Sequence, residues 1–468
     1  MRLQEEKGSS VEFILNDRVV LKNPDEQSIR QIKSALTYPN PEYKTLSRLG
    51  KWTGKTPEKI TFYEHEDDIL TCPRGFADKA YRICKGNHEK INIVDQRLEL
   101  KPVDIFFNGQ LKDFQSKAAD AILKESHGVL SAGTGSGKTV ISLNVIAERG
   151  QPTLVVVHSI ELMHQWIDRI DMFLGIPPHE TGVIGGGKYK IGEKITVGLY
   201  QSVRKKIEEL NPMFGHVVVD ECHKCPSRTF TEAVAGFYAK YRLGLTATAY
   251  RRDGLGILIC LVLGEQRYHI EKAPLVENGD ISEAKVVCRP TGFNTSLDAS
   301  VEYSRVIREL TLDDARNRLI CNDIAKEDRS GIRLVLTDRR EHAILIHDIL
   351  KHQYNLSSQV LTGSAQSNER EIIVDELNRG NISTLIATGQ LIGEGFDMPD
   401  LTSLFLVTPI KFKGRLIQYI GRILRPSPEK TIAVIYDYID MNVGVLKASA
   451  TTRLDIYRQE GIAVDCDM

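Results

Sequence analysis

From about Asp113 onward, short aliphatic and β-branched runs alternate with longer segments whose apolar positions repeat at a helical period. The apolar run Thr153–Val157 precedes the amphipathic segment Glu161–Leu174. In the same way, His216–Val219 precedes Phe230–Tyr241. Runs of the first kind are typical of buried strands, and segments of the second kind are typical of helices. Their alternation predicts a parallel α/β architecture.

A second series of the same kind follows a helical stretch over Ser300–Lys326. The polar segment Glu277–Ala284 lies just before the point where the two series meet. The chain is therefore expected to hold two successive α/β units. The predicted strands of the second unit are Ile332–Leu336, Ser357–Leu361, Thr384–Ala387, Ser403–Val407 and Thr431–Tyr436.

Residues 1–105 have a different pattern, because they are rich in charged and turn residues and hold only short apolar runs. Val11–Leu15 and Ile60–Tyr63 are predicted strands, and Ser28–Leu36 between them is a predicted helix. At about 150 residues per domain, the length of 468 residues favours about three domains. We therefore predict a small α+β module over residues 1–105, a first α/β domain over 106–285 and a second over 286–468.

The charges nearly balance, with 61 Lys and Arg against 62 Asp and Glu, so the formal net charge is −1. This balance argues against binding of nucleic acid through bulk positive charge, although a local basic groove is compatible with it. The first residues lack the apolar core of a signal peptide, and the longest apolar run, Leu255–Leu263, is about half of the ~20 residues that span a bilayer. Cys222 and Cys225 form a CxxC pair, but no second pair with zinc-like spacing follows, so the eight cysteines favour reduced thiols. We expect a cytoplasmic protein without membrane contact.

A glycine-rich turn lies between a predicted strand and a predicted helix, where residues 128–139 read GVLSAGTGSGKT. Glycines let such a turn aim its backbone N–H groups at phosphate oxygens, and the following helix adds a favourable dipole. Lys138 is then expected to reach the β- and γ-phosphates of ATP, and the Thr139 hydroxyl to ligate Mg²⁺. A chance glycine-rich turn is the alternative, against which the strand–loop–helix context argues. The candidate phosphate-binding residues are Gly133, Thr134, Gly135, Ser136, Gly137, Lys138 and Thr139.

An acidic pair follows the apolar strand predicted at 216–219. Asp220 is placed to hold Mg²⁺, and Glu221 to polarise the water that attacks the γ-phosphate. Adjacent carboxylates at a strand end are otherwise a solvated turn, but the phosphate loop favours the catalytic interpretation. Together the two motifs predict an ATPase.

These residues resemble superfamily 2 helicases and translocases of the DExH-box type, whose box is similar to Asp220-Glu221-Cys222-His223. Gln115 resembles the glutamine that reads adenine, and residues 244–248 (GLTAT) resemble motif III. The similar motifs follow the family's order across residues 111–425. The resemblance implies two tandem RecA-like parallel-sheet domains of the P-loop NTPase class. It implies nucleic-acid contacts at His158, Gln201, Ser202, Arg339 and Thr388.

Two further motifs of the family resemble segments of the second unit. Gly395 and Asp397 lie in the segment that is similar to motif V, and Gln418, Arg422 and Arg425 lie in the one that is similar to motif VI. An arginine from the second domain stabilises charge on the γ-phosphate only when the cleft is closed. We favour Arg425 as this arginine finger, with Arg422 as the second candidate and a surface role as the alternative.

Within the superfamily, residues 182–195 and 338–342 resemble the branch of XPB and phage UvsW. Arg251-Arg252-Asp253 departs from the Arg-Glu-Asp element of XPB, since Arg252 stands in place of the acid. Residues 38–76 resemble the DNA-binding N-terminal domain of UvsW-like helicases.

Independently of this resemblance, residues 44–59 hold five basic residues against the single acid Glu58. Basic residues interleaved with Trp52 suit a phosphate backbone with occasional base stacking, and Lys51, Trp52 and Lys55 are the candidate contacts. A solvated face with Trp52 as a core anchor is the alternative.

The leading hypothesis is an ATP-dependent DNA helicase or translocase of repair, recombination or fork remodelling, with ATP and Mg²⁺ as cofactors. Its expected partners are duplex, branched or single-stranded DNA, with nuclease or repair proteins as further candidates. An ATP-gated nucleic-acid clamp without processive unwinding and an RNA helicase remain the two alternatives.

Overall fold

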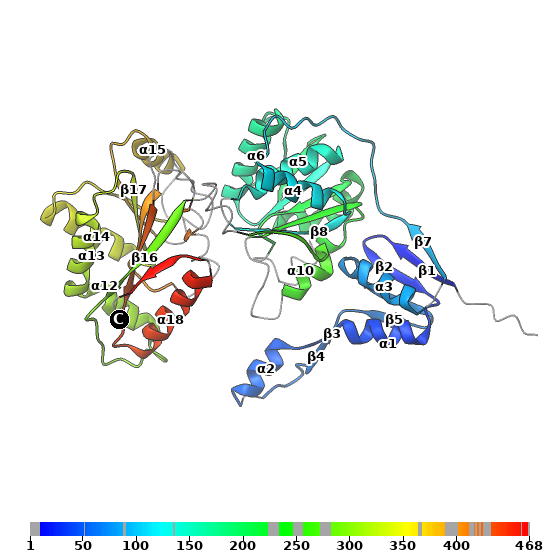
Figure 1. The fold of residues 1–468 in the computed structure, drawn as a ribbon, viewed down its shortest axis with the longest axis horizontal. Helices are drawn as coiled ribbons and strands as arrows, with labels where there is room; N and C mark the ends of the chain where they lie inside the picture. The colour runs from blue at the N-terminus through cyan, green and yellow to red at the C-terminus, as the bar shows by residue number, and fades with distance from the viewer. Residues whose placement is uncertain are drawn as a thin grey trace, which may run out of the picture. The chain divides into compact units, whose positions relative to one another are not determined.

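The computed structural model describes residues 10–50, 52–87, 90–133, 136–222, 234–246, 256–271, 282–363, 367–388, 401–410, 416, 419–420, 423–424, 432–459 and 461–466. The chain divides into two compact units (Figure 1). The first consists of Met1–Ala132 and Gly137–Ile270. The second consists of Gly133–Ser136 and Glu271–Met468.

The N-terminal part of the first unit is built on a five-stranded sheet in the order β5-β6-β2-β1-β7. Only β1 and β7 run parallel within it. The helix α1 begins after Asp25, whose carboxylate accepts a hydrogen bond from the backbone N–H of Ser28. The elements are β1 (Ser10–Leu15), β2 (Arg18–Lys22), α1 (Glu26–Ala35), β5 (Glu64–Glu66), β6 (Ile69–Pro73), η1 (Arg74–Phe76), α3 (Ala77–Gly86) and β7 (Lys90–Asp95).

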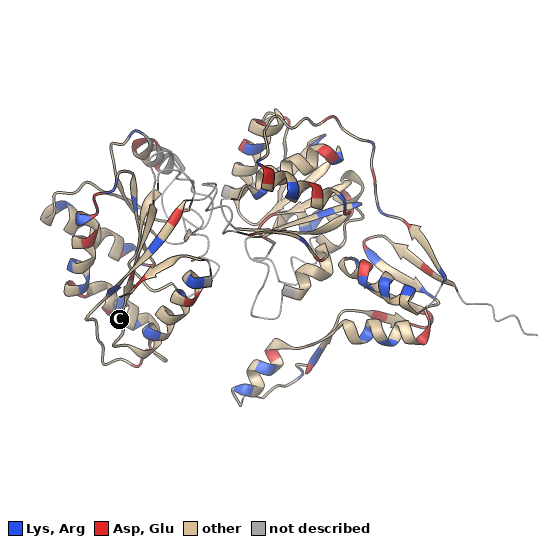
Figure 2. Cartoon of the chain, in the orientation of Figure 1, with Lys and Arg blue, Asp and Glu red and all other residues tan. Residues whose placement is uncertain are grey.

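Residues 37–61 leave this sheet as a separate extension, which we call the arm. Its strands β3 (Thr37–Pro39) and β4 (Lys59–Thr61) pair only with each other, in antiparallel register. Between them lies α2 (Pro41–Arg48), which begins with the cap Asn40 and contains no buried residue. Figure 1 shows α2 at the end of the arm, and Figure 2 shows Lys and Arg along it.

The rest of the first unit, which we call the first α/β half, holds an eight-stranded sheet in the order β11-β10-β12-β9-β13-β14-β8-β15. All its strands are parallel except the hairpin strand β11. Strands such as β9 are buried at every position, as the continuous apolar runs predicted. The elements are α4 (Asp113–Leu123), β8 (His127–Ala132), α5 (Lys138–Arg149), β9 (Thr153–Val157), α6 (Ile160–Leu174), β10 (Gly182–Gly185), β11 (Lys188–Lys190), β12 (Ile195–Leu199), α7 (Tyr200–Val203), η2 (Arg204–Lys206), α8 (Ile207–Leu210), η3 (Asn211–Met213), β13 (His216–Val219), β14 (Tyr241–Thr246), α10 (Gly256–Leu263) and β15 (Gln266–Ile270).

The second unit, which we call the second α/β half, holds a seven-stranded parallel sheet in the order β18-β19-β17-β20-β21-β16-β22. Two parallel-sheet α/β units are thus present, as predicted. The elements are β16 (Glu283–Pro290), α12 (Tyr303–Leu312), α13 (Asp314–Lys326), β17 (Ile332–Thr337), α14 (Arg340–Gln353), β18 (Gln359–Leu361), α15 (Ser367–Asn378), β19 (Thr384–Thr388), β20 (Leu401–Leu406), β21 (Ile432–Ile439), α18 (Gly444–Gln459) and β22 (Ala463–Asp465).

Two details differ from the sequence pattern. The helix predicted over Phe230–Tyr241 cannot extend to its end, because Tyr241 is the first residue of β14. The β14 strand pairs with β13 from Tyr241 onward, so sheet formation overrides the helical period there. In addition, β16 starts at Glu283, so the boundary drawn between residues 285 and 286 falls inside a strand.

The N-terminal module packs directly on the first α/β half. Arg74 is buried and donates hydrogen bonds to the backbone oxygens of Ala239 (2.6 Å) and Lys240 (2.5 Å). A Cβ on Gly75 would overlap the carbonyl oxygen of Cys260 in α10, so only glycine fits there. Leu261 of α10 belongs to the apolar core of the module, whereas Val262 belongs to the core of the first α/β half. The helix α10 is therefore shared by both cores.

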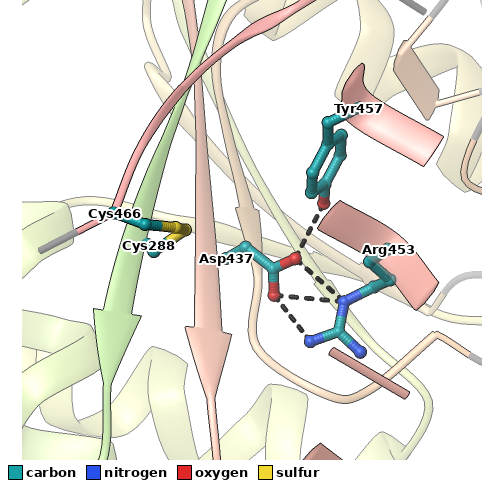
Figure 3. Close-up of a disulfide and its surroundings, with 5 residues drawn as sticks. All are labelled: Cys288, Asp437, Arg453, Tyr457 and Cys466. Atoms are coloured by element: carbon teal, nitrogen blue, oxygen red, sulfur yellow. Dashed lines mark hydrogen bonds and ion pairs between the residues drawn. A yellow bond between two sulfur atoms is a disulfide. The ribbon is translucent and has the colours of Figure 1, made fainter. Parts of the chain in front are cut away.

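The prediction that the thiols are reduced is wrong for one pair, since Cys288 and Cys466 form a disulfide (Figure 3). The parallel pairing of Val287 with Asp465 sets the two cysteines side by side. They are 178 positions apart in the sequence, which is why their spacing gave no signal. The cysteines that the structure describes outside this disulfide are Cys72, Cys84, Cys222, Cys260 and Cys321.

Beside the disulfide, a buried ion pair ties α18 to β21 (Figure 3). Arg453 contacts the Asp437 carboxylate at 2.8 Å, and the Tyr457 hydroxyl donates to the same carboxylate at 2.8 Å.

Among the residues that the structure describes, no helix has the length and apolar character needed to cross a membrane.

Candidate active site

The glycine-rich turn joins the end of β8 to the start of α5. Gly137 has a left-handed backbone with φ of 80°, and a Cβ there would overlap the Nε2 atom of Gln115. Lys138, the first residue of α5, is only 9% exposed, and its Nζ donates to the Ala132 carbonyl oxygen at 2.9 Å. Within the turn, the Ser136 hydroxyl donates to the Gly133 carbonyl oxygen at 2.7 Å. These contacts hold the Lys138 side chain against the glycine-rich turn.

Gln115 is buried in the first turns of α4, where its Oε1 accepts a hydrogen bond from the Lys112 backbone N–H at 3.0 Å. This bond fixes the amide in one orientation beside Gly137. The structure therefore brings the predicted adenine-reading residue to the same turn as Lys138, and Thr139 follows as the second residue of α5.

The acidic pair lies directly after β13. Asp220 is 5% exposed, and burial raises the pKa of its carboxyl to about 6. The neighbouring Glu221 adds to the rise, whereas the Trp166 hydrogen bond and Lys138 oppose it. Its Oδ1 accepts from the Glu221 backbone N–H and its Oδ2 from the Trp166 indole N–H, each at 2.8 Å. Glu221 itself has a φ of 49°, an uncommon conformation for a non-glycine residue that is typical of functional sites.

Both groups meet at one edge of the sheet, because β8, β14 and β13 are parallel neighbours and all end there. We call this the carboxyl edge of the first sheet. A buried lysine, a buried carboxylate and a glycine turn fit a nucleoside triphosphate with its divalent cation. In such a site Thr139 and Asp220 would supply oxygen ligands, which are the ligands that Mg²⁺ prefers.

The predicted nucleic-acid contacts of the first half lie on the same edge. His158 follows the last residue of β9, and Gln201 and Ser202 lie in α7, which follows β12. Since Val157 and Leu199 are register partners, the two segments leave the sheet side by side. In the second half, Arg339 lies two residues after the end of β17, and Thr388 ends β19. Thr337 of β17 and Thr388 of β19 are also register partners.

In the arm, Trp52 is 89% exposed, so the alternative in which it anchors a core is wrong. Its ring lies against Gly54, where a Cβ would come within 3.2 Å of it. Lys55 is exposed, as are the other described basic residues of the arm, Lys44, Arg48 and Lys59.

Several predicted site residues lie outside the described residues. They are Lys51, Thr134, Gly135, Gly395, Asp397, Gln418, Arg422 and Arg425.

Comparison with known families assigns both halves. Residues 108–251 match the model of the type III restriction enzyme res subunit, and residues 315–427 match that of the helicase conserved C-terminal domain. The chain belongs to the superfamily 2 helicases. Helicases of this family use ATP, so the protein is an ATP-dependent helicase.

Three curated relatives resemble this helicase over most of their length. It is 28% identical to the DNA 3'-5' translocase XPB2 of Sulfurisphaera tokodaii, over 75% of this chain and 85% of the relative. It is 28% identical to the probable helicase D10 of Escherichia phage T5, over 80% of each chain. It is 26% identical to the ATP-dependent DNA helicase uvsW of Enterobacteria phage T4, over 73% of this chain and 70% of the relative.

Solved structures show the same fold. The type ISP restriction-modification enzyme LlaBIII bound to DNA matches with a TM-score of 0.57 at 15% identity, over 75% of this helicase and 30% of that chain. The S. cerevisiae protein Dbp5 bound to RNA and ADP BeF3 matches with a TM-score of 0.55 at 15% identity, over 76% of this helicase and 90% of that chain.

One contact of the site was not foreseen from the sequence, namely that of Trp166 of the helicase with Asp220. Trp166 lies in the segment Glu161–Leu174, which the sequence pattern predicted only as an amphipathic helix. A single tryptophan on an amphipathic helix is expected to be a core residue. The pairing of β9 with β13 is what brings Trp166 to the Asp220 carboxylate.

Proposed function

We propose that this helicase moves on or remodels duplex or branched DNA, in repair, recombination or fork remodelling. The observation that carries the proposal is the carboxyl edge of the first sheet. The buried pair of Lys138 and Asp220 and the segments at His158 and Gln201 lie on that one edge, so hydrolysis and strand binding are adjacent. The relatives named as DNA translocase and DNA helicase support DNA as the substrate.

In the proposed mechanism, the glycine turn and Lys138 bind the phosphates, and Gln115 orients the base. Mg²⁺, held by Thr139 and Asp220, would supply charge neutralisation at the phosphates. Glu221 accepts the proton of the attacking water. From the resemblance to motif VI, we propose Arg425, with Arg422 as the second candidate, as the arginine finger that stabilises charge on the γ-phosphate. Gln418, Gly395 and Asp397 are further proposed site residues on the same ground.

The arm is the proposed DNA-binding surface outside the two α/β halves. Its exposed basic residues suit the phosphate backbone, and Trp52 presents an uncovered ring on which a base can stack. We accordingly treat residues 1–105 as the DNA-binding module. The two motor domains are those expected over residues 106–285 and 286–468, with all of β16 from Glu283 assigned to the second. Lys51 joins Trp52 and Lys55 as a proposed contact, and Arg339 and Thr388 are the proposed contacts of the second half.

The deciding experiment compares ATP hydrolysis in the presence of single-stranded, duplex and branched DNA and of RNA. We expect the largest stimulation by duplex or branched DNA. Stimulation by RNA alone would contradict the proposal and favour an RNA helicase. Stimulation by DNA that is accompanied by neither strand displacement nor triplex displacement would favour an ATP-gated clamp instead.

A further inference from the structure

We propose that Trp166 is a positioning residue of the ATP site, which holds the Asp220 carboxylate in the one orientation that receives Mg²⁺. Trp166 lies in α6 and is 1% exposed, and its indole N–H donates to Asp220 Oδ2 at 2.8 Å. This inference rests on the proposed Mg²⁺–ATP site.

The contact follows from the sheet. Because β9 and β13 are parallel neighbours, Val156 pairs with Val219, and the Asp220 backbone N–H donates to the Val156 oxygen at 3.0 Å. The chain then leaves β9 and enters α6, whose cap Ser159 accepts from the Leu162 backbone N–H. Trp166 lies in the second turn of this helix and so reaches the carboxylate at the end of the neighbouring strand.

The carboxylate is held at both oxygens. Oδ1 accepts from the Glu221 backbone N–H and Oδ2 from the indole, so rotation about the Cβ–Cγ bond breaks at least one hydrogen bond. Each carboxylate oxygen has two lone pairs, so one donor per oxygen still leaves a lone pair for a cation or for its bound water. The two hydrogen bonds therefore orient the Asp220 carboxylate and still leave lone pairs for the cation.

The chemistry of the indole suits this role. It is a donor only, it is uncharged, and it does not titrate. A lysine or a protonated histidine at the same place would also hold the carboxylate, but its positive charge would oppose a divalent cation. Groups that orient a metal ligand in this way typically change metal affinity by about 10- to 100-fold when removed.

The test removes the N–H and keeps the aromatic bulk. In Trp166→Phe, we expect the affinity for a fluorescent ATP analogue in the presence of Mg²⁺ to fall about tenfold or more. Affinity for the same analogue in EDTA should stay within about twofold, because the base and phosphate contacts are intact. The Mg²⁺ concentration that half-saturates ATP hydrolysis should rise by a similar factor, while kcat at saturating Mg²⁺ falls much less.

Phe214→Leu is the matched control, since Phe214 is a buried aromatic of the same half and has no polar atom. It should leave the Mg²⁺ dependence unchanged while lowering the unfolding temperature. If Trp166→Phe does not fold, 3-benzothienylalanine placed at position 166 exchanges only the N–H for sulfur and should give the same result.

An unchanged Mg²⁺ dependence in the folded variant, or equal losses with Mg²⁺ and with EDTA, would overturn the inference. Failure of the proposed function is distinguishable, because it would appear as missing DNA stimulation in the unaltered protein, whereas the binding measurements contain no DNA.

Discussion

Lys138 and Asp220 on the carboxyl edge of the first sheet are 9% and 5% exposed, whereas every described basic residue of the arm is exposed to solvent. At this edge, hydrogen bonds fix both side chains, as in the contact of Lys138 with the Ala132 carbonyl oxygen. In the arm, α2 buries no residue, and Trp52 stands almost fully in solvent. Buried charge suits one small ligand in one geometry, while exposed charge suits a polyanion that is held in many registers.

The largest effect should come from removing the buried cation. Lys138→Ala should lower the DNA-stimulated rate of ATP hydrolysis by about 100-fold or more, because a group aimed at the transferring phosphate is lost. Steady-state ATPase assays measure this. Lys101→Ala removes an exposed lysine elsewhere in the chain and serves as the control. Full stimulation in Lys138→Ala would refute the assignment of the edge as the ATP site.

The second test uses the pKa of the buried Asp220 carboxyl, which is about 6 in the folded protein against an ordinary value of 3.8. Because folding raises this pKa, the ionised group destabilises the fold above pH 6, and the cost disappears as the pH falls towards 4. Relative to Asp220→Asn, the unaltered protein should therefore gain on the order of 3 kcal/mol in free energy of unfolding across that window.

Urea unfolding without nucleotide, for both proteins at several pH values, measures this difference. Parallel pH profiles of the two proteins would show that the pKa of the Asp220 carboxyl is not raised in the folded protein.

The third test concerns the arm. Trp52→Ala should weaken DNA binding by about 1–3 kcal/mol if one base stacks on the ring, and it should leave the unfolding temperature nearly unchanged because the ring is 89% exposed. Fluorescence anisotropy with labelled DNA measures the affinity. Phe106→Ala is a matched control, since Phe106 is an exposed aromatic outside the arm. Equal losses in both variants would remove the distinction between the arm and the remaining surface.

The smallest effect should come from a single exposed cation. Lys55→Ala should weaken binding similarly for all DNA sequences and lower the slope of log affinity against log salt by about 1. Titrations between low and moderate salt determine this slope. An unchanged slope would mean that Lys55 does not neutralise a phosphate.

Local pattern was sufficient for some of the strands, since Thr153–Val157 and His216–Val219 are fully buried strands where they were predicted. The local pattern was wrong where pairing with a distant segment determines the structure. At Tyr241, which was expected to end a helix, pairing with His216 of β13 makes the residue part of a strand. The disulfide and the contact of Trp166 with Asp220 were not predicted for the same reason, because each depends on which strands are neighbours in the sheet.

In the arm, the sequence alone left two interpretations of Trp52 open. Composition and spacing are the same whether an aromatic ring faces a core or a ligand, and only its exposure separates the two cases.

The helix α10, which is shared between the N-terminal module and the first α/β half, has a consequence for how such proteins are recombined. Leu261 faces one core and Val262 the other, and Gly75 has no room for any side chain against the helix. A chimera that joined the N-terminal region of another relative to this α/β half would leave Leu261 against a foreign surface. The N-terminal module and the first α/β half therefore cannot be exchanged independently between relatives. Substitutions in the two surfaces that meet at α10 have to match each other.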